Sequence, residues 1–203
     1  MNEAQVIAVD LDGTFTLTNT LHESVLTLVR NKPFILLILP IWLFHGKAYL
    51  KQKVAEHSEL DVTTLPYNQS LIDWLKEEKL RGKKIVLSTA ANEKIAKAVV
   101  TNFDIFDDTI ASDSTTNLKS ALKRDALQER YGDKGYDYAG NSNDDLEVWA
   151  GASNAIVVNA SESVVSKASK LTSVSQIFST ERASFAIWIK SDHSWNSHFD
   201  LTH

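Results

Sequence analysis

Two aspartates one residue apart, Asp10 and Asp12, follow the apolar segment VIAV at residues 6–9. In a strand, side chains two positions apart point to the same side, so both carboxylates can face one site. Like charges this close repel each other, and burial strengthens the repulsion. The pair is therefore typical of a site that holds a cation, or in which one carboxylate attacks while the other handles a proton. Gly13 lets the chain turn sharply directly afterwards.

Five short apolar segments predict the buried strands that would position such residues, at 5–10, 83–89, 108–112, 136–140 and 154–159. Helical patterns lie between most of them. Apolar residues spaced three and four apart predict one helix over 95–103 and another over 118–131, which ends before Gly132. This alternation favours an α/β, Rossmann-like fold with a mostly parallel, five-stranded sheet and helices on both faces. In such folds, ligands bind at the carboxyl ends of the strands.

Residues 16–66 interrupt the alternation, because they contain no clear strand and are too long for a simple crossover connection. Thr20 and Glu23 fit a capping box at the start of a helix. Residues 68–81, followed by Gly82, predict a helix that returns the chain to the sheet. We expect three parts: a core formed by residues 1–15 and 67–180, a small helical cap at 16–66 and a C-terminal tail at 181–203.

Residues 33–47, PFILLILPIWLFHGK, are the most apolar part of the chain. We expect no transmembrane helix here, because the uninterrupted apolar stretch is far below the roughly 20 residues that cross a bilayer and Pro40 divides it. Two interpretations stay open: a buried helix of the cap, or an apolar surface for a lipid-like substrate or a membrane face. The second takes account of the positive charge that flanks the segment, at Arg30, Lys32, Lys47, Lys51 and Lys53.

The overall composition is that of a soluble globular protein, with 43% hydrophobic and 23% charged residues. A net charge of −5 gives no support to nucleic-acid binding. The chain has no cysteine, which excludes disulfides, thiolate metal sites and a cysteine nucleophile. Because the N-terminus leads directly into a strand, we expect no secretory signal. We expect a cytoplasmic protein, with peripheral contact at the membrane as the alternative.

Four motifs, in this order, resemble those of the haloacid dehalogenase-like (HAD) phosphohydrolase superfamily. They are DLDGT at 10–14, a strand ending in Ser88 and Thr89, Lys119 at the start of a helix, and GNSNDD at 140–145. The resemblance covers about residues 5–160. Two solvated loop aspartates would explain the first motif taken alone, but four motifs at strand ends and helix starts form a much more specific pattern.

The resemblance implies a role for each matched position. Asp10 would be the nucleophile that forms an aspartyl-phosphate, and Asp12 would protonate the leaving group and then activate the hydrolytic water. The hydroxyl of Thr89, with Ser88 as the alternative, would hold the phosphoryl group, and Lys119 would offset negative charge on Asp10 and on the phosphoryl oxygens. The residues expected around the phosphate are Gly13, Thr14, Ser88 and Ala90.

The resemblance also implies Mg²⁺, held by Asp10, Asp12, Asn141 and Asp145. Asn141 stands where many members of the family have an aspartate. Its amide oxygen can bind Mg²⁺ but brings no charge, so metal binding is expected to be weaker. Asp145 matches the family's other acidic position, with the adjacent Asp144 as the alternative. A polar helix N-terminus would explain the same cluster.

An aspartate two residues after the nucleophile is found in the phosphatases and phosphomutases of the superfamily, and not in the members that attack carbon–halogen bonds. The resemblance therefore implies a Mg²⁺-dependent phosphatase that acts on a phosphomonoester. A phosphomutase is one alternative. A phosphate-binding or regulatory module with weakened catalysis is the other, because Asn141 lacks the charge of an aspartate.

A more specific similarity is to the HAD-type domain found at the N-terminus of some membrane prenyltransferases. It is carried by the apolar segment at 33–45, TLPYN at 64–68, STAAN at 88–92, TTNLK at 115–119 and YAGNSNDDLEVW at 138–149. This similarity implies a phosphorylated lipid or a polyprenyl-linked sugar phosphate as substrate, and a phosphorylated small molecule stays open as the other substrate class. It also implies a prenyltransferase as a partner.

Overall fold

The computed structural model describes residues 5–113 and 115–179, so the tail expected at 181–203 lies outside the described residues. A six-stranded sheet forms its centre, in the order β3-β2-β1-β4-β5-β6, and every neighbouring pair is parallel. The strands are β1 (Val6–Val9), β2 (Lys84–Asn92), β3 (Asp108–Ser112), β4 (Asp137–Gly140), β5 (Asn154–Val158) and β6 (Ser173–Phe178). The predicted α/β class with a parallel sheet is confirmed.

The predicted number of five strands is wrong, because β6 adds a sixth strand at the edge of the sheet, beside β5. Its sequence, SVSQIF, alternates polar and apolar residues in part, and its side chains are exposed or half-buried. An edge strand pairs with a single neighbour and does not need the continuous apolar run of a central parallel strand. A search for buried apolar segments therefore misses β6.

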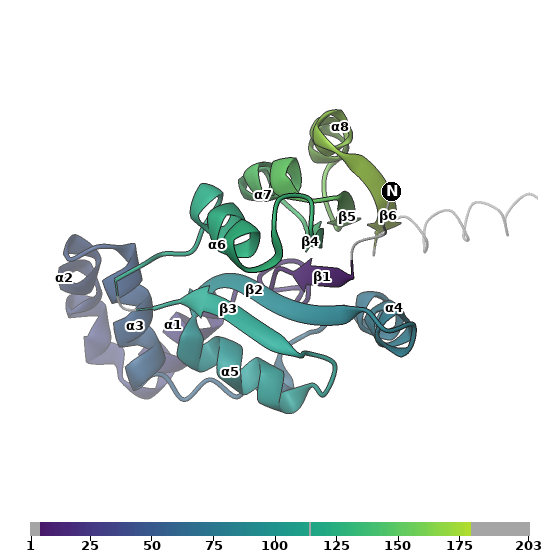
Figure 1. The fold of residues 1–203 in the computed structure, drawn as a ribbon. Coiled ribbons are helices and arrows are strands. Elements are labelled where there is room, and N and C mark those ends of the chain that lie inside the picture. Colours follow the sequence, from purple (N-terminus) through teal and green to yellow (C-terminus); the bar gives the residue numbers. More distant parts are fainter. Residues whose placement is uncertain (1–4, 114, 180–203) are drawn as a thin grey trace, which may run out of the picture.

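Helices cover both faces of the sheet (Figure 1). Because successive side chains of a strand point to opposite faces, Leu87 packs with α4 and α5, whereas Val86 packs with α6, α7 and α8. Asn68 caps α4, and this helix confirms the one predicted over 68–81. These five helices are α4 (Gln69–Leu80), α5 (Glu93–Asn102), α6 (Ala121–Tyr131), α7 (Leu146–Gly151) and α8 (Glu162–Leu171).

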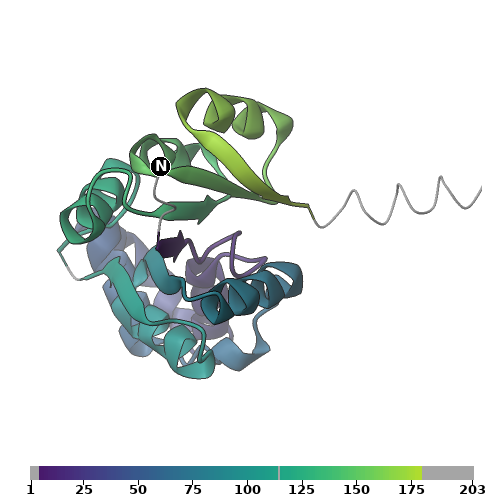
Figure 2. The ribbon, with the colours of Figure 1, turned by 45° about the vertical axis from the view of Figure 1, so that its right-hand side comes forward.

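The segment between β1 and α4 is helical and lies beside the carboxyl end of β2 and beside α5, as Figures 1 and 2 show. Its elements are α1 (Thr20–Asn31), the 3₁₀ helix η1 (Pro33–Leu37), α2 (Leu39–Phe44), α3 (Lys47–His57) and the 3₁₀ helix η2 (Val62–Thr64). Leu28, Ile35, Trp42 and Val54 form a small apolar cluster within it. Lys94 of α5 donates a hydrogen bond of 2.6 Å to the carbonyl of Ala55, which ties α3 to the rest of the molecule.

Helix α1 is capped by a different residue from the one the pattern indicated. Asn19 accepts hydrogen bonds from two backbone N–H groups of the first turn. The N–H of Thr20 instead donates to Asp12, and the carboxylate of Glu23 accepts from the hydroxyl of Thr18. The predicted Thr20–Glu23 capping box is therefore wrong, because Asn19 already satisfies the first turn.

The apolar segment at 33–47 folds as η1, α2 and the start of α3, and not as one helix. Pro33 and Pro40 each lie in the first turn of a separate helix, where a missing N–H costs nothing. Within this segment only Ile35 and Trp42 are buried. The interpretation as a buried helix is thus wrong for most of the segment. Among the described residues, no helix combines the length and apolarity needed to cross a bilayer.

Candidate active site

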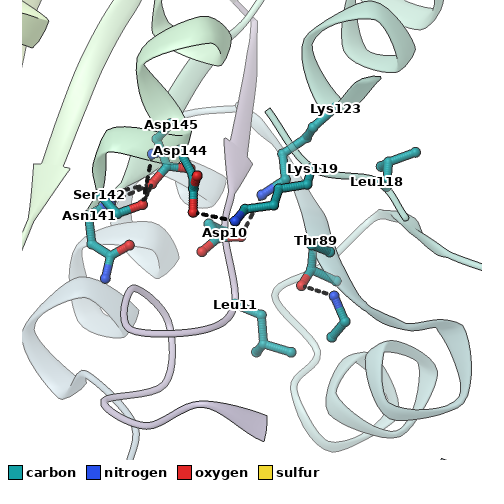
Figure 3. Close-up of polar contacts among 12 residues, drawn as sticks. Asp10, Leu11, Thr89, Leu118, Lys119, Lys123, Asn141, Ser142, Asp144 and Asp145 are labelled. Carbon is teal, nitrogen blue, oxygen red and sulfur yellow. Dashed lines mark hydrogen bonds and ion pairs between the residues drawn. The ribbon is translucent and has the colours of Figure 1, made fainter. Parts of the chain in front are cut away.

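The sequence motifs meet at the carboxyl ends of β1, β2 and β4. Strand β1 pairs in parallel with both neighbours, so the three strands end at the same edge. Asp10 directly follows β1, Thr89 lies in the last part of β2, and Asn141 directly follows β4. In Figure 3 these three side chains surround the end of β1, with Lys119 and Lys123 on the side of α6.

Asp10 and Lys123 form a buried ion pair. The Nζ atom of Lys123 lies 2.6 Å from Oδ1 of Asp10, and the two side chains are 4% and 11% exposed. Burial raises the pKa of Asp10 to about 7, with Lys123 acting against this rise. Burial also acts against the charge of Lys123, yet the carboxylates of Asp10 and Asp145 raise its pKa. Each partner of the pair therefore favours the charged form of the other, against the effect of burial.

Lys119 does not hold the position against Asp10 that the sequence predicted. Its Nζ atom lies 2.8 Å from Oδ2 of Asp144, and both side chains are about half exposed (49% and 55%). Lys119 precedes the first residue of α6, Ala121, whereas Lys123 lies inside the helix. The lysine that neutralises Asp10 is thus four residues later than expected, because the helix starts later than the motif indicated.

A sequence signal for Lys123 exists on α6. Lys123 and Leu127 are four residues apart, share one face and are the buried residues of this helix. By contrast, the apolar Leu122 of the same helix is 52% exposed. A lysine spaced with the buried face of a helix is informative, because lysine is almost never buried without a partner.

Asp145 is a structural acceptor in the turn after β4. Its Oδ2 accepts from the backbone N–H groups of Asn141 and Ser142, each at 3.0 Å, and from the hydroxyl of Ser142 at 3.1 Å. Its Oδ1 accepts from the hydroxyl of Tyr138 at 2.8 Å. Ser142 and Asp145 form a capping box. The alternative of a polar helix N-terminus is confirmed, and both oxygens of this predicted metal ligand are in hydrogen bonds.

Asp10 after β1 and Asn141 after β4 carry side-chain oxygens that could bind a cation. The amide of Asn141 lies over Gly13, where a Cβ would come within 2.2 Å of Nδ2 and where φ is +78°, so only glycine fits. Among the described residues, no cluster of three His, Asp or Glu side chains is arranged to hold a metal. One carboxylate with one amide oxygen is a hard donor set that fits Mg²⁺, which keeps several waters in most protein sites.

Asp12 lies on the wall of a cavity between the helical segment and the sheet. Its Oδ1 accepts from the N–H of Thr20 at 2.7 Å, and the cavity has a volume of about 60 Å³. Lys51 of α3 lies on the same wall and donates to the carbonyl of Ala90 at 2.6 Å and to Asn117 at 2.8 Å. Burial lowers the pKa of Lys51, and Asp12 acts in the opposite direction. Sequence reasoning counted Lys51 only as a flanking charge.

No family model matches the chain. A sequence relative, the uncharacterized protein y4nM of Sinorhizobium fredii, is 35% identical over 150 residues, which cover 73% of this chain and 29% of that protein. The chain therefore spans less than a third of the length of this relative.

Two solved structures resemble the whole arrangement of sheet and helices. The HAD family hydrolase t0658 from Salmonella enterica serovar Typhi has a TM-score of 0.58 and 14% identity, over 86% of this chain and 68% of that one. A phosphoserine phosphatase structure with an analogue of its phospho-aspartyl intermediate has a TM-score of 0.62 and 13% identity, over 92% of this chain and 99% of that one. The chain has the fold of the HAD hydrolases.

In this HAD fold, the hydroxyls predicted around the phosphate are all buried. Thr89 accepts from the N–H of Ala91 at 2.9 Å through its Oγ1. The hydroxyls of Thr14 and Ser88 have no hydrogen-bond partner among the described residues. Buried hydroxyls without partners are rare, and a ligand or a water is the usual explanation. Ala90, by contrast, uses its carbonyl to accept from Lys51.

Tyr138 connects Lys123 and Asp145 in this site, and its hydroxyl is expected to contribute to stability. It accepts from Lys123 at 2.9 Å and donates to Asp145 at 2.8 Å. Tyr138→Phe would leave both groups short of a partner, so we expect a loss of about 1–3 kcal/mol in the free energy of unfolding. Urea denaturation measures this loss. Tyr136→Phe is the control, because the hydroxyl of Tyr136 makes only a 3.4 Å contact with a carbonyl; equal losses would contradict the assignment.

Proposed function

We propose that this protein is a HAD-type phosphatase that hydrolyses a phosphomonoester through an aspartyl-phosphate on Asp10. The observation that carries the proposal is the buried carboxylate of Asp10 at the end of β1, paired with Lys123 and followed two residues later by Asp12. The shared fold with a HAD family hydrolase and with a phosphoserine phosphatase that carries a phospho-aspartyl analogue supports it.

The chemistry requires two steps at one carboxylate. An oxygen of Asp10 attacks phosphorus, the bond to the leaving oxygen breaks, and Asp12 gives that oxygen a proton. Asp12 then takes a proton from a water whose oxygen attacks phosphorus, which releases phosphate and restores Asp10. Lys123 offsets the negative charge that gathers as the phosphoryl group approaches. The hydroxyl of Thr89, or of Ser88, would donate to a phosphoryl oxygen.

Mg²⁺ is the proposed cofactor, and Asp10 and Asn141 would hold it. When bound, it would neutralise charge between the nucleophile and the phosphoryl oxygens. Asp145 is less suited to this role than the resemblance implied, because both of its carboxylate oxygens already accept hydrogen bonds. Asp12 has one oxygen in a hydrogen bond, as Asp10 has, and stays a candidate ligand.

The helices at 16–66 would serve as a cap on the core formed by residues 1–15 and 67–180. They line the cavity beside Asp12 and bring Lys51 to its wall. We propose a phosphorylated small molecule as the substrate, by analogy with the phosphoserine phosphatase that shares the fold. A phosphorylated lipid or polyprenyl-linked sugar phosphate, with a prenyltransferase as partner, is the second candidate, favoured by the exposed apolar side chains of η1 and α2.

The experiment that tests the proposal measures phosphate release from a generic aryl phosphate with and without Mg²⁺. We expect turnover that depends on Mg²⁺ and falls by at least about 1,000-fold in Asp10→Asn, because the amide cannot act as the nucleophile. Asp133→Asn is the matched control, since this carboxylate is exposed and outside the site. Full activity of Asp10→Asn, or turnover without any effect of Mg²⁺, would rule the mechanism out.

Asn141 also supports a second candidate, a phosphate-binding or regulatory module in which a weak metal site limits turnover. In that case Asn141→Asp would create activity where the natural protein has little. Rapid turnover by the natural protein in the same assay excludes the module. A phosphomutase differs from both, because its product keeps the phosphate on the substrate.

A further inference from the structure

Helices η1 and α2, residues 33–44, form an apolar tip whose large side chains face outward. Six of them are more than half exposed: Phe34, Leu36, Leu37, Ile41, Leu43 and Phe44. The two phenylalanines are 81% and 91% exposed. Single exposed apolar residues are ordinary, but a contiguous group of this kind marks a contact surface.

The inner side of the apolar tip packs against other helices of the same chain. Ile35 and Trp42 are buried and pack with Leu28 of α1 and Val54 of α3. The segment is therefore apolar on both its inner and its outer side. A helix that is apolar all round belongs in a protein interior or in lipid. The outer side of the tip has apolar residues without a covering element among the described residues.

The charge around the apolar tip has one sign. Between Glu23 and Glu56 the sequence contains no acidic residue, although the whole chain has a net charge of −5. The five basic residues of this interval are Arg30, Lys32, Lys47, Lys51 and Lys53. The three closest to the tip, Arg30, Lys32 and Lys47, are exposed and form no ion pair within the described part of the chain. An apolar surface bordered by free cations matches an anionic lipid bilayer.

We propose that the apolar tip docks on the surface of an anionic membrane. The exposed apolar side chains would enter the boundary between head groups and acyl chains, and Arg30, Lys32 and Lys47 would contact the anionic head groups. Figure 1 places α2 at an outer extremity of the molecule, so this element can meet a flat surface before other elements do. This docking is independent of the phosphatase chemistry and requires no residue of the active site.

Co-sedimentation of the full chain with vesicles tests the proposal. We expect binding to phosphatidylcholine vesicles that contain phosphatidylglycerol, and much weaker binding to phosphatidylcholine alone or in high salt. The double variant Phe34→Ser/Phe44→Ser should bind at least about tenfold more weakly, because two exposed aromatic side chains no longer enter the lipid. Lys32→Gln and Lys47→Gln should each weaken binding about fivefold.

Leu80→Ser is the matched control, because Leu80 is 89% exposed at the end of α4, outside the apolar tip. It should leave vesicle binding unchanged. Asp10→Asn should also bind normally, which separates this proposal from the proposed function. Binding that is unaffected by Phe34→Ser/Phe44→Ser overturns the proposal. A lack of vesicle binding by the natural protein overturns it as well. The proposal also fails if light scattering shows that the natural protein is a dimer and that Phe34→Ser/Phe44→Ser is a monomer, because the tip is then a contact between two protein chains.

Discussion

Lys123→Met is expected to reduce phosphatase activity by about 100- to 1,000-fold, the effect of losing one preorganised charge at a developing anion. Above pH 7, where Asp10 has to ionise, it should also lower the free energy of unfolding by up to about 3–5 kcal/mol, because the change leaves the carboxylate of Asp10 buried without its cation. The side chain of Lys123 is 4% exposed, so water cannot replace the ion pair at 2.6 Å. Phosphate release and urea denaturation measure the two effects.

The stability loss in Lys123→Met should depend on pH. Lys123 opposes the rise in the pKa of Asp10, so its removal raises that pKa further above the value of the unfolded chain. A carboxyl group with a raised pKa in the folded state costs stability only where it must ionise, above its unfolded pKa. We therefore expect a small loss near pH 4 and a larger one as the pH rises through about 7.

Lys119→Met is the control for this prediction. Lys119 pairs with Asp144 at the surface, where both side chains are about half exposed, and such pairs contribute less than about 1 kcal/mol. Its activity should stay within a few-fold of the natural protein. A larger loss of activity in Lys119→Met than in Lys123→Met would restore the role that the sequence motif suggested for Lys119.

Asp145→Ala is expected to be the most destabilising change in the turn after β4, by at least about 3 kcal/mol. The carboxylate is 3% exposed and accepts from two backbone N–H groups and two hydroxyls, all of which would lose their acceptor. Urea denaturation in buffer without Mg²⁺ measures the loss. The loss in Asp145→Asn should be smaller than that in Asp145→Ala but larger than zero, because asparagine has nearly the same size and keeps one acceptor oxygen.

Asp144→Ala is the matched control, since it removes a neighbouring carboxylate that is 55% exposed and pairs with Lys119 at the surface. We expect less than about 1 kcal/mol from it. The absence of Mg²⁺ makes the comparison decisive. If the main task of Asp145 were to hold the metal, Asp145→Ala would be as stable as the natural protein in that buffer, and the structural role assigned to this residue would be wrong.

Local sequence is sufficient to predict the central strands and the residues at their ends. Strands β1 and β5 are apolar along almost their whole length, and β2 and β4 each contain apolar residues that are buried, which is what burial on both faces requires. Parallel strands share one carboxyl edge, so the sequence predicts Asp10, Thr89 and Asn141 at the same edge of the sheet. That they lie beside one another follows from the order of the strands in the sheet, which puts β1 between β2 and β4. The same pattern does not predict strand β6, because an edge strand need not be apolar.

Only the tertiary structure decided which charges are paired and which apolar side chains are covered. The side chain that faces Asp10 depends on where α6 begins, because each residue added to a helix turns the face by about 100°. Lys119 and Lys123 have the same chemistry in the sequence, and only packing buries one and exposes the other. Likewise, the sequence shows that residues 33–44 are apolar, but the exposure of their side chains depends on the elements that pack around them. Residue type and spacing determine the chemistry that is available, while burial, a property of the whole fold, determines where that chemistry acts.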